Sequence, residues 1–321
     1  MVTVRAKPRI RDILLTAAVN AASAPPSTFF YGGQAVLEGV LMRGRSHYAV
    51  AARRPNGEIA VRQDVLKSRV YTSRAWSRPF LRGVAGLYET LHLGMRALQW
   101  SASVQLGEEA ELGAGPMRVA MLIALVFALL LFIGAPLLLT SLLRRGHSQS
   151  IVSVLIEGVI RGAVLLLYLL AIGRIRNIQR LFQYHGAEHK AINCLESGNA
   201  VVVANVRPSS RLHPRCGTGF LVVVALVSAV VFAPLGLLPT AVRLACQIVL
   251  IPLVAAVSYE VIRGLARIRH STIGAILLAP VLGTQLLTTR EPDDAQIEVA
   301  ITALDAARSG EGSVGELAVI P

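Results

Sequence analysis

Two histidines and a glutamate stand close together in the stretch LFQYHGAEHKAINCLE. His185 and His189 are four residues apart, so on a helix both imidazoles lie on one face and can reach one ion. Imidazole suits zinc and related divalent metals. The H-x-x-E-H pattern is that of zinc peptidases, in which the histidines hold the ion and the glutamate activates a water. The stretch therefore predicts a divalent metal centre, zinc in the first place, with Glu188 as the general base.

Two histidines do not complete such a centre, because zinc takes at least three protein ligands. The stretch RLHPRCGTGF supplies His213 and Cys216. We predict that His213 joins the two histidines in the first shell, with Cys216 or Glu196 as the next ligand. Glu196 qualifies because it lies seven residues beyond the second histidine, on roughly the same helix face. Cys194 is also near, about one turn beyond the second histidine.

The same residues admit two further interpretations. A closed shell of three histidines and a cysteine would favour a structural metal, whereas three ligands and a water would favour catalysis. Histidine and glutamate are also common on the hydrogen-bonded polar face of a helix at a membrane edge. The sequence leaves all three open.

The composition places the chain in the membrane class. It has 321 residues, of which 54% are hydrophobic and 16% charged. The net charge of +13 fits membrane topology and attraction to anionic lipid. No run of Lys and Arg is interleaved with aromatics, which argues against a nucleic-acid partner. Three cysteines argue against a disulfide scaffold.

Four apolar segments are candidates for transmembrane helices: Val119–Leu143, Ile151–Gly173, Gly219–Val242 and Leu244–Tyr259. The second contains Glu157 and Arg161, one helical turn apart, which can pair or lie near one end. Arg243 marks the turn between the third and fourth segments. Ser271–Thr289 is predicted to be juxtamembrane or re-entrant, with a fifth span as the alternative.

The arginines and lysines predict the orientation. Fifteen of them precede Arg118, and seven lie in the connection 174–215, whereas the two intervening turns carry two and one. The positive-inside rule then places both termini and the connection with the H-x-x-E-H stretch on the cytoplasmic side of the cytoplasmic membrane.

The remaining elements predict a small cytoplasmic α+β unit. Asn56-Gly57 between two β-prone runs predicts a β-hairpin at residues 47–66. A helix over 79–98 has an apolar stripe that includes Leu81, Leu91 and Met95, and it either lies on the membrane or covers the hairpin. A helix begins near Asp293, with one apolar face formed by Ile297, Ala300, Ile301 and Leu304.

The predicted fold is thus an α-helical integral membrane protein with about four transmembrane helices and this α+β unit. The expected division has seven parts: a flexible basic lead 1–30, the α+β unit 31–117, a first transmembrane pair 118–173, the metal-binding connection 174–218, a second pair 219–260, a juxtamembrane segment with the C-terminal helix 261–308, and a flexible tail 309–321.

Five blocks carry a resemblance to a known family: GGQAVLEGVLMRG, PFLRGVAGLYETLHLGMRAL, FQYHGAEHKAIN, HPRCGTGF and TTREPDDAQIEVAITAL. In this order they resemble the YqhQ family of bacterial membrane proteins of unknown function, and together they cover most of the chain. The resemblance implies a metal-dependent enzyme, although that description of the family rests on the same His, Glu and Cys residues. It also favours Cys216 over Cys194 as a ligand.

The sequence thus predicts a metal-dependent hydrolase at the cytoplasmic face of the bilayer. Its substrate would be a membrane-associated protein, a peptide or a lipid-linked molecule. The alternative is a non-enzymatic membrane scaffold or assembly factor with a structural metal, whose basic unit engages a protein, an anionic lipid or RNA. A transporter comes third. The oligomeric state is not predicted.

Overall fold

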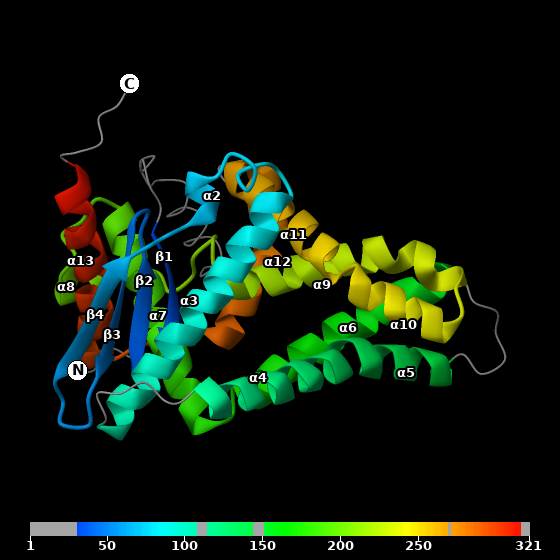
Figure 1. Cartoon of the computed structure of the whole chain (residues 1–321), viewed down its shortest axis with the longest axis horizontal. Coiled ribbons are helices and arrows are strands. Elements are labelled where there is room, and N and C mark those ends of the chain that lie inside the picture. Colours follow the sequence, from blue (N-terminus) through cyan, green and yellow to red (C-terminus); the bar gives the residue numbers. More distant parts are fainter. Residues whose placement is uncertain (1–30, 108–113, 144–150, 269–270, 316–321) are drawn as a thin grey trace, which may run out of the picture.

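The computed structural model describes residues 31–107, 114–143, 151–268 and 271–315. Near the N-terminus it contains an antiparallel sheet with strand order β1-β2-β3-β4 (Figure 1). The strands are β1 (Gly32–Val36), β2 (Gly39–Arg43), β3 (His47–Arg53) and β4 (Ile59–Val65). The chain therefore forms a simple meander before any long helix begins.

The predicted hairpin at residues 47–66 is confirmed as β3 and β4. Its register runs from His47 opposite Val65 to Arg53 opposite Ile59. Gly57 adopts φ 92° in the turn, a conformation that favours glycine. The first hairpin, β1–β2, was not predicted. Its turn is made at Glu38, which itself adopts a positive φ of 49°.

Helices cover both faces of the sheet. One face packs against α7 (Arg176–Glu196) and α13 (Asp294–Gly315) in a core that includes Met42, Tyr184 and Leu304. The predicted apolar face of the C-terminal helix is confirmed, because its members are buried or partly buried in this core. The sheet thereby supports α7, the helix that carries the H-x-x-E-H residues.

The other face of the sheet packs against α3 (Leu81–Leu106). The predicted helix over 79–98 is confirmed, and it covers the sheet, which was one of its two predicted positions. Leu81 and Leu91 of its apolar stripe are exposed, whereas Leu93 and Ala97 are buried against the sheet. Small residues of α3 allow close packing on the sheet. The carboxamide of Gln34, for example, lies against Gly94.

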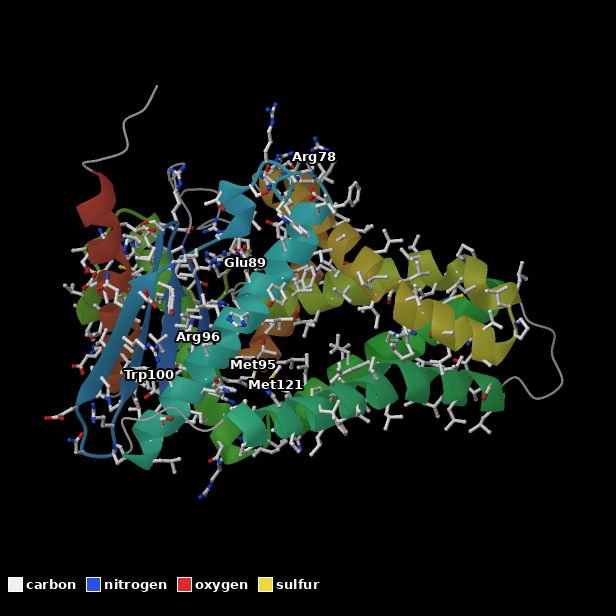
Figure 2. All side chains as sticks on the ribbon, viewed as in Figure 1. Arg78, Glu89, Met95, Arg96, Trp100 and Met121 are labelled. Atoms are coloured by element: carbon white, nitrogen blue, oxygen red, sulfur yellow. The ribbon has the colours of Figure 1, made fainter. Side chains whose placement is uncertain are left out.

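Side chains of α3 contact the sheet and the segment that leads from the sheet to α3. Glu89, Arg96 and Trp100 follow one another from the middle of the helix toward its C-terminal end (Figure 2). Glu89 accepts a hydrogen bond from Arg43 of β2 at 3.0 Å and another from Ser68 at 2.6 Å. Ser68 lies just before the short helix α2 (Arg69–Thr72). The helix is thus tied to β2 by an ion pair as well as by apolar contact.

An elongated bundle of apolar helices extends from the sheet (Figure 1). Its elements are α4 (Ala114–Leu129), the π-helical turn η1 (Leu130–Gly134), α5 (Ala135–Leu143), α6 (Ile151–Ile172), α9 (Gly217–Phe232), the 3₁₀ turn η2 (Ala233–Leu237), α10 (Thr240–Val249), α11 (Ile251–Arg267) and α12 (Thr272–Thr288). By length and composition, three of the helices are able to cross a membrane: Gly115–Leu143, Leu155–Ile172 and Gly217–Leu237. A fourth span exists if the bent pair α10–α11 counts as one.

The fourth predicted segment differs most from the structure. Instead of one short helix over Leu244–Tyr259, the structure has two helices, α10 and α11, which meet at an angle of 50° and together run from Thr240 to Arg267. The apolar helix α12 has 17 residues and falls short of the three longer candidates. The juxtamembrane or re-entrant position of Ser271–Thr289 stays a prediction, with a fifth span as its alternative.

A polar cluster lies inside this bundle. Glu157 accepts from Arg161 at 2.8 Å and from Gln247 at 2.9 Å, and its second oxygen accepts from Arg243. The predicted pairing of Glu157 with Arg161 is confirmed. Arg243, which the sequence assigned to a turn, is a buried member of the cluster on α10. Arg161 also donates to the carbonyl of Phe132 in the π-helical turn, so an irregular backbone group finds a partner.

The ends of the predicted division fall partly outside the described residues. The flexible lead 1–30 and positions 316–321 of the tail lie there. The predicted start of the tail at residue 309 was wrong, because α13 continues to Gly315. Glu311 holds this end of the helix to the sheet by accepting from the hydroxyl of Tyr31 at 2.6 Å and from the amide of Ser46 at 3.2 Å.

Candidate metal centre

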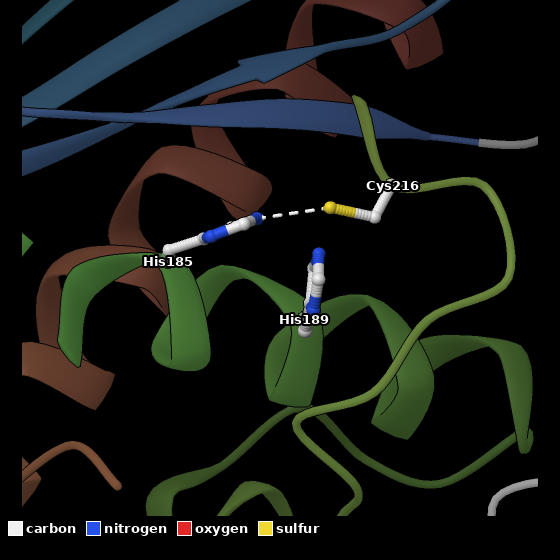
Figure 3. A group of neighbouring side chains, drawn as sticks. All are labelled: His185, His189 and Cys216. Atoms are coloured by element: carbon white, nitrogen blue, oxygen red, sulfur yellow. Dashed lines mark hydrogen bonds between the residues drawn. The ribbon is translucent and has the colours of Figure 1, made fainter. Parts of the chain in front are cut away.

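One face of α7 and the residue before α9 bring three ligand atoms together. His185 and His189 project from α7 toward Cys216, as Figure 3 shows. One ligand atom from each residue lies within 4.8 Å of the others, and His185 Nε2 is 3.1 Å from Cys216 Sγ. Zinc bond lengths of about 2.0–2.3 Å imply tetrahedral ligand separations of about 3.3–3.8 Å. Binding one ion would therefore move His185 Nε2 and Cys216 Sγ slightly apart and bring any donor pair near the 4.8 Å limit closer together.

Helix α7 also holds the loop that delivers the cysteine. Lys190 donates to the carbonyl of Arg207 at 2.7 Å. Asn193 donates to the carbonyls of Ser210 and Leu212 at 2.7 and 3.0 Å. These side chains follow the histidines on the same helix, so a single element positions both halves of the cluster. The intervening segment contains the short helix α8 (Val203–Val206).

Backbone carbonyls fix the orientation of both imidazoles. His185 Nδ1 lies 2.9 Å from the carbonyl of Thr288, and His189 Nδ1 lies 2.6 Å from the carbonyl of Arg211. A carbonyl only accepts, so each Nδ1 carries the proton and each Nε2 is left for another partner. Metal-ligating histidines are held in this way, with the second ring nitrogen donating to a carbonyl or carboxylate.

Cys216 occupies the N-cap position of α9. Its sulfur accepts from the backbone N–H of Thr218 at 3.4 Å, and the Thr218 hydroxyl lies 3.1 Å away. Burial alone raises the pKa of this thiol, but the neighbouring imidazoles of His189 and His185 lower it well below its usual value. The thiolate is the form that binds metals. Burial lowers the pKa of His185, but the adjacent sulfur raises it to about 9.

Glu188 lies buried beside the three donors. Among the described residues, its Oε2 atom has no hydrogen-bond partner. Burial raises the pKa of this carboxyl, and the imidazoles of His189 and His185 oppose the rise. Gly33 of β1 leaves room for the side chain, since a Cβ there would come within 2.8 Å of the Glu188 carboxyl carbon. Burying a carboxylate oxygen without a hydrogen bond costs free energy, so we expect Oε2 of Glu188 to bind a further partner.

The structure does not bring His213 into this cluster. Its ring centroid is 5.6 Å from that of His189, and its Nε2 lies 3.6 Å from Glu196. Glu196 also accepts from Arg215. Burial lowers the pKa of His213 to about 4, against the opposing effect of Glu196. The buried His213 and the partly buried Glu196 therefore form a separate pair next to the three donors.

Cys194 lies apart from the donors as well, with its sulfur 3.6 Å from the carbonyl of Ala200. The sequence reasoning missed the residues that orient the donors, which are Arg211, Thr218 and Thr288. Their signal was their position inside or beside the blocks HPRCGTGF and TTREPDD. Main-chain carbonyls leave no residue-type pattern, so spacing could not identify them.

Gly186 offers a test of the support for His185. A Cβ at Gly186 would lie 2.1 Å from the carbonyl oxygen of Arg290, a backbone atom that cannot move freely. We expect Gly186→Ala to destabilise the fold by about 1–3 kcal/mol and to weaken metal binding, because Thr288 would shift with the displaced segment. Thermal unfolding and a metal titration measure the two effects. The matched control is Gly162→Ala in α6, where no side-chain or long-range atom lies within 4 Å of the added Cβ. An equal effect in both variants would contradict the account.

Comparisons with known proteins place the chain among uncharacterised proteins. The sequence model of a family described as "Protein of unknown function (DUF1385)" matches residues 78–309. The "Uncharacterized protein YqhQ" of Bacillus subtilis (strain 168) is 34% identical over 295 residues, covering 88% of this chain and 92% of the Bacillus protein. No solved structure matches the chain.

Proposed function

The chain belongs to the DUF1385 family of YqhQ-like proteins of unknown function. For this member we propose a membrane metalloprotein with hydrolase activity. Its ion, zinc in the first place, would be held by His185, His189 and Cys216. The observation that carries the proposal is the convergence of these three donors within 4.8 Å, with both imidazoles oriented by backbone carbonyls. Soft sulfur with imidazole nitrogen is a donor set that suits zinc.

Each residue of the site has a distinct role in this proposal. A zinc ion with three protein ligands supplies Lewis acidity and lowers the pKa of a coordinated water toward about 7. Glu188 would accept the proton of the attacking water through Oε2, for which the described part of the chain supplies no hydrogen-bond partner. Thr288 and Arg211 keep the imidazoles in the tautomer that exposes Nε2. His213 and Glu196 support the loop that carries the cysteine.

Membrane insertion is part of the proposal. The apolar helices named above would span the cytoplasmic membrane, with the sheet, the metal centre and both termini on the cytoplasmic side, as the positive-inside rule indicates. Only three residues separate the end of α6 from the start of α7, the helix that carries both histidines. A substrate would therefore be a membrane-associated protein, a peptide or a lipid-linked molecule.

A specific observation favours a second candidate function, in which the metal is structural and the protein is a scaffold. His189 is 1% exposed and Cys216 is 4% exposed. Structural zinc sites are closed, whereas catalytic sites keep a position open. In a scaffold the ion would clamp the loop before α9 to α7.

Glu188→Gln separates the two functions. If the site is hydrolytic, we expect hydrolysis of small chromogenic carboxylic and phosphate esters by the purified chain to fall by about 10²–10⁴-fold, because the general base is removed. Bound metal should stay near the wild-type level, since no donor has changed. The matched control is Glu298→Gln on the exposed side of α13, which should leave turnover unaltered. Metal-loaded wild-type protein without turnover, or turnover unchanged in Glu188→Gln, would favour the structural site.

A further inference from the structure

A pocket opens where the end of α6, the loop before α9 and the end of α12 meet. Its volume is about 240 Å³. Four leucines form its apolar wall: Leu169, Leu170, Leu286 and Leu287. Sites that enclose a whole drug-sized ligand measure about 300–1,000 Å³. This pocket therefore suits a small headgroup rather than a complete lipid molecule.

Three arginines line the same pocket, namely Arg174, Arg211 and Arg290. Arg211 donates to the carbonyl of Thr289 at 3.2 Å, and Arg290 donates to the carbonyl of Gly173 at 2.8 Å. These carbonyls orient the guanidinium groups but do not neutralise them. Within the described part of the chain, none of the three arginines forms an ion pair with a carboxylate.

Three other arginines of the connection 174–218 are each paired with a carboxylate. Arg180 pairs with Glu38, Arg207 with Asp294, and Arg215 with Glu196. The pocket thus concentrates three uncompensated positive charges against an apolar wall. An anion with an apolar tail complements both features. Guanidinium groups bind phosphate oxygens through paired N–H donors, which makes a phosphate the best-matched anion.

The position of the pocket favours a lipid over a soluble anion. Leu169 and Leu170 belong to the candidate span Leu155–Ile172, and Arg174 follows two residues after its end. With α6 in a membrane, the leucines lie at the edge of the hydrocarbon and the arginine lies at headgroup level. Anionic headgroups of the cytoplasmic leaflet attract basic residues at this depth.

We propose that the pocket binds the phosphate headgroup of an anionic phospholipid, whose acyl chains lie along α6 and α12. This rests on the proposed membrane insertion of α6 but not on a bound metal. The pocket adjoins the candidate metal centre, because Arg211 lines it and the backbone carbonyl of Arg211 accepts the hydrogen bond from His189. A lipid held there would stabilise the loop that orients one of the donors.

The test uses the full chain in detergent, titrated with dioctanoyl phosphatidylglycerol, dioctanoyl phosphatidylcholine and inorganic phosphate by isothermal calorimetry. We expect saturable binding of phosphatidylglycerol and none of phosphatidylcholine. The double variant Arg174→Gln/Arg290→Gln should bind about 25-fold more weakly, from about fivefold for each arginine. Arg176→Gln is the matched control, since it removes an exposed charge close by that does not line the pocket, and its binding should match the wild type.

Each alternative outcome has a distinct meaning. Unchanged affinity in the double variant, with thermal unfolding like the wild type, would overturn the pocket as the site. Equal binding of the two lipids would overturn the anionic headgroup. Inorganic phosphate that binds as tightly as phosphatidylglycerol would identify a soluble ligand and overturn the lipid. Binding should survive treatment with a metal chelator, so failure of the metal proposal leaves this result intact. Release of the chain from membranes by alkaline carbonate would contradict the insertion separately.

Discussion

Cys216→Ser is expected to lower the affinity of the purified chain for Zn²⁺ by more than about 100-fold, beyond the roughly 10–100-fold loss that follows removal of an outer-shell partner. The reason is chemical. The thiolate is a strong zinc ligand, and the N–H of Thr218 together with two imidazoles favours that charged form. A serine hydroxyl stays protonated at neutral pH. Competition with a chromogenic chelator measures the affinity, and cobalt substitution should show a thiolate charge-transfer band that the variant lacks.

His213→Ala is the matched control for this prediction. It removes an imidazole close in sequence and in space, but one that faces Glu196 instead of the donors. We expect zinc affinity to stay within about tenfold of the wild type, at the lower end of outer-shell effects. If His213→Ala lost the ion while Cys216→Ser kept it, the first shell expected from the sequence would be correct and the cluster in the structure would not be the site.

Glu157→Gln is expected to destabilise the fold by about 3–5 kcal/mol, the range for breaking a buried ion pair on one side. Glu157 is 1% exposed and binds Arg161 and Arg243, which are 7% and 5% exposed. The glutamine cannot neutralise either guanidinium. Two positive charges would remain inside the bundle, at a cost that is larger still if the bundle lies in a membrane.

Thermal unfolding of the detergent-solubilised chain measures this effect. Glu298→Gln again provides the control, because its ion pair with Arg53 is half exposed and worth only about 0–1 kcal/mol. A difference below about 1 kcal/mol between the Glu157 and Glu298 variants would contradict the role assigned to the buried cluster. A rescue by the double variant Glu157→Gln/Arg243→Leu would support it, since the excess charge would then fall.

The sequence predicted elements wherever a local signal exists. Asn56-Gly57 marked the second hairpin because the turn needs a positive φ, and the structure has it at Gly57. The first hairpin turns at Glu38, a residue type that gives no such signal. The apolar face of α13 was visible from its period. That it packs against the sheet was not, because this contact joins residues far apart in the chain.

In the candidate site, too, the sequence predicted what depends on local spacing and not what depends on contacts between distant segments. Helical spacing was enough to place His185 and His189 on one face of α7. The choice between His213 and Cys216 depended on how the loop before α9 turns over that helix. Lys190 and Asn193 determine this turn by binding its carbonyls, and such contacts leave no pattern in residue spacing.

The buried charges of the bundle were also only partly predictable from the sequence. Pairing of Glu157 with Arg161 followed from their separation by one turn. Arg243 of α10 joins this pair, although it lies 86 residues from Glu157 along the chain. Its place next to a proline-containing turn made it look like a turn residue. Only the packing of α6 against the segment after α9 reveals the third charge.

X-ray absorption spectroscopy at the zinc edge on the purified wild-type chain tests the central claim most directly. We predict one zinc per chain, with one sulfur at about 2.3 Å and two imidazole nitrogens at about 2.0–2.1 Å. These are the distances expected for Cys216, His185 and His189. A chain that retains no metal after zinc loading, or a bound zinc whose shell contains only nitrogen and oxygen, would contradict the claim.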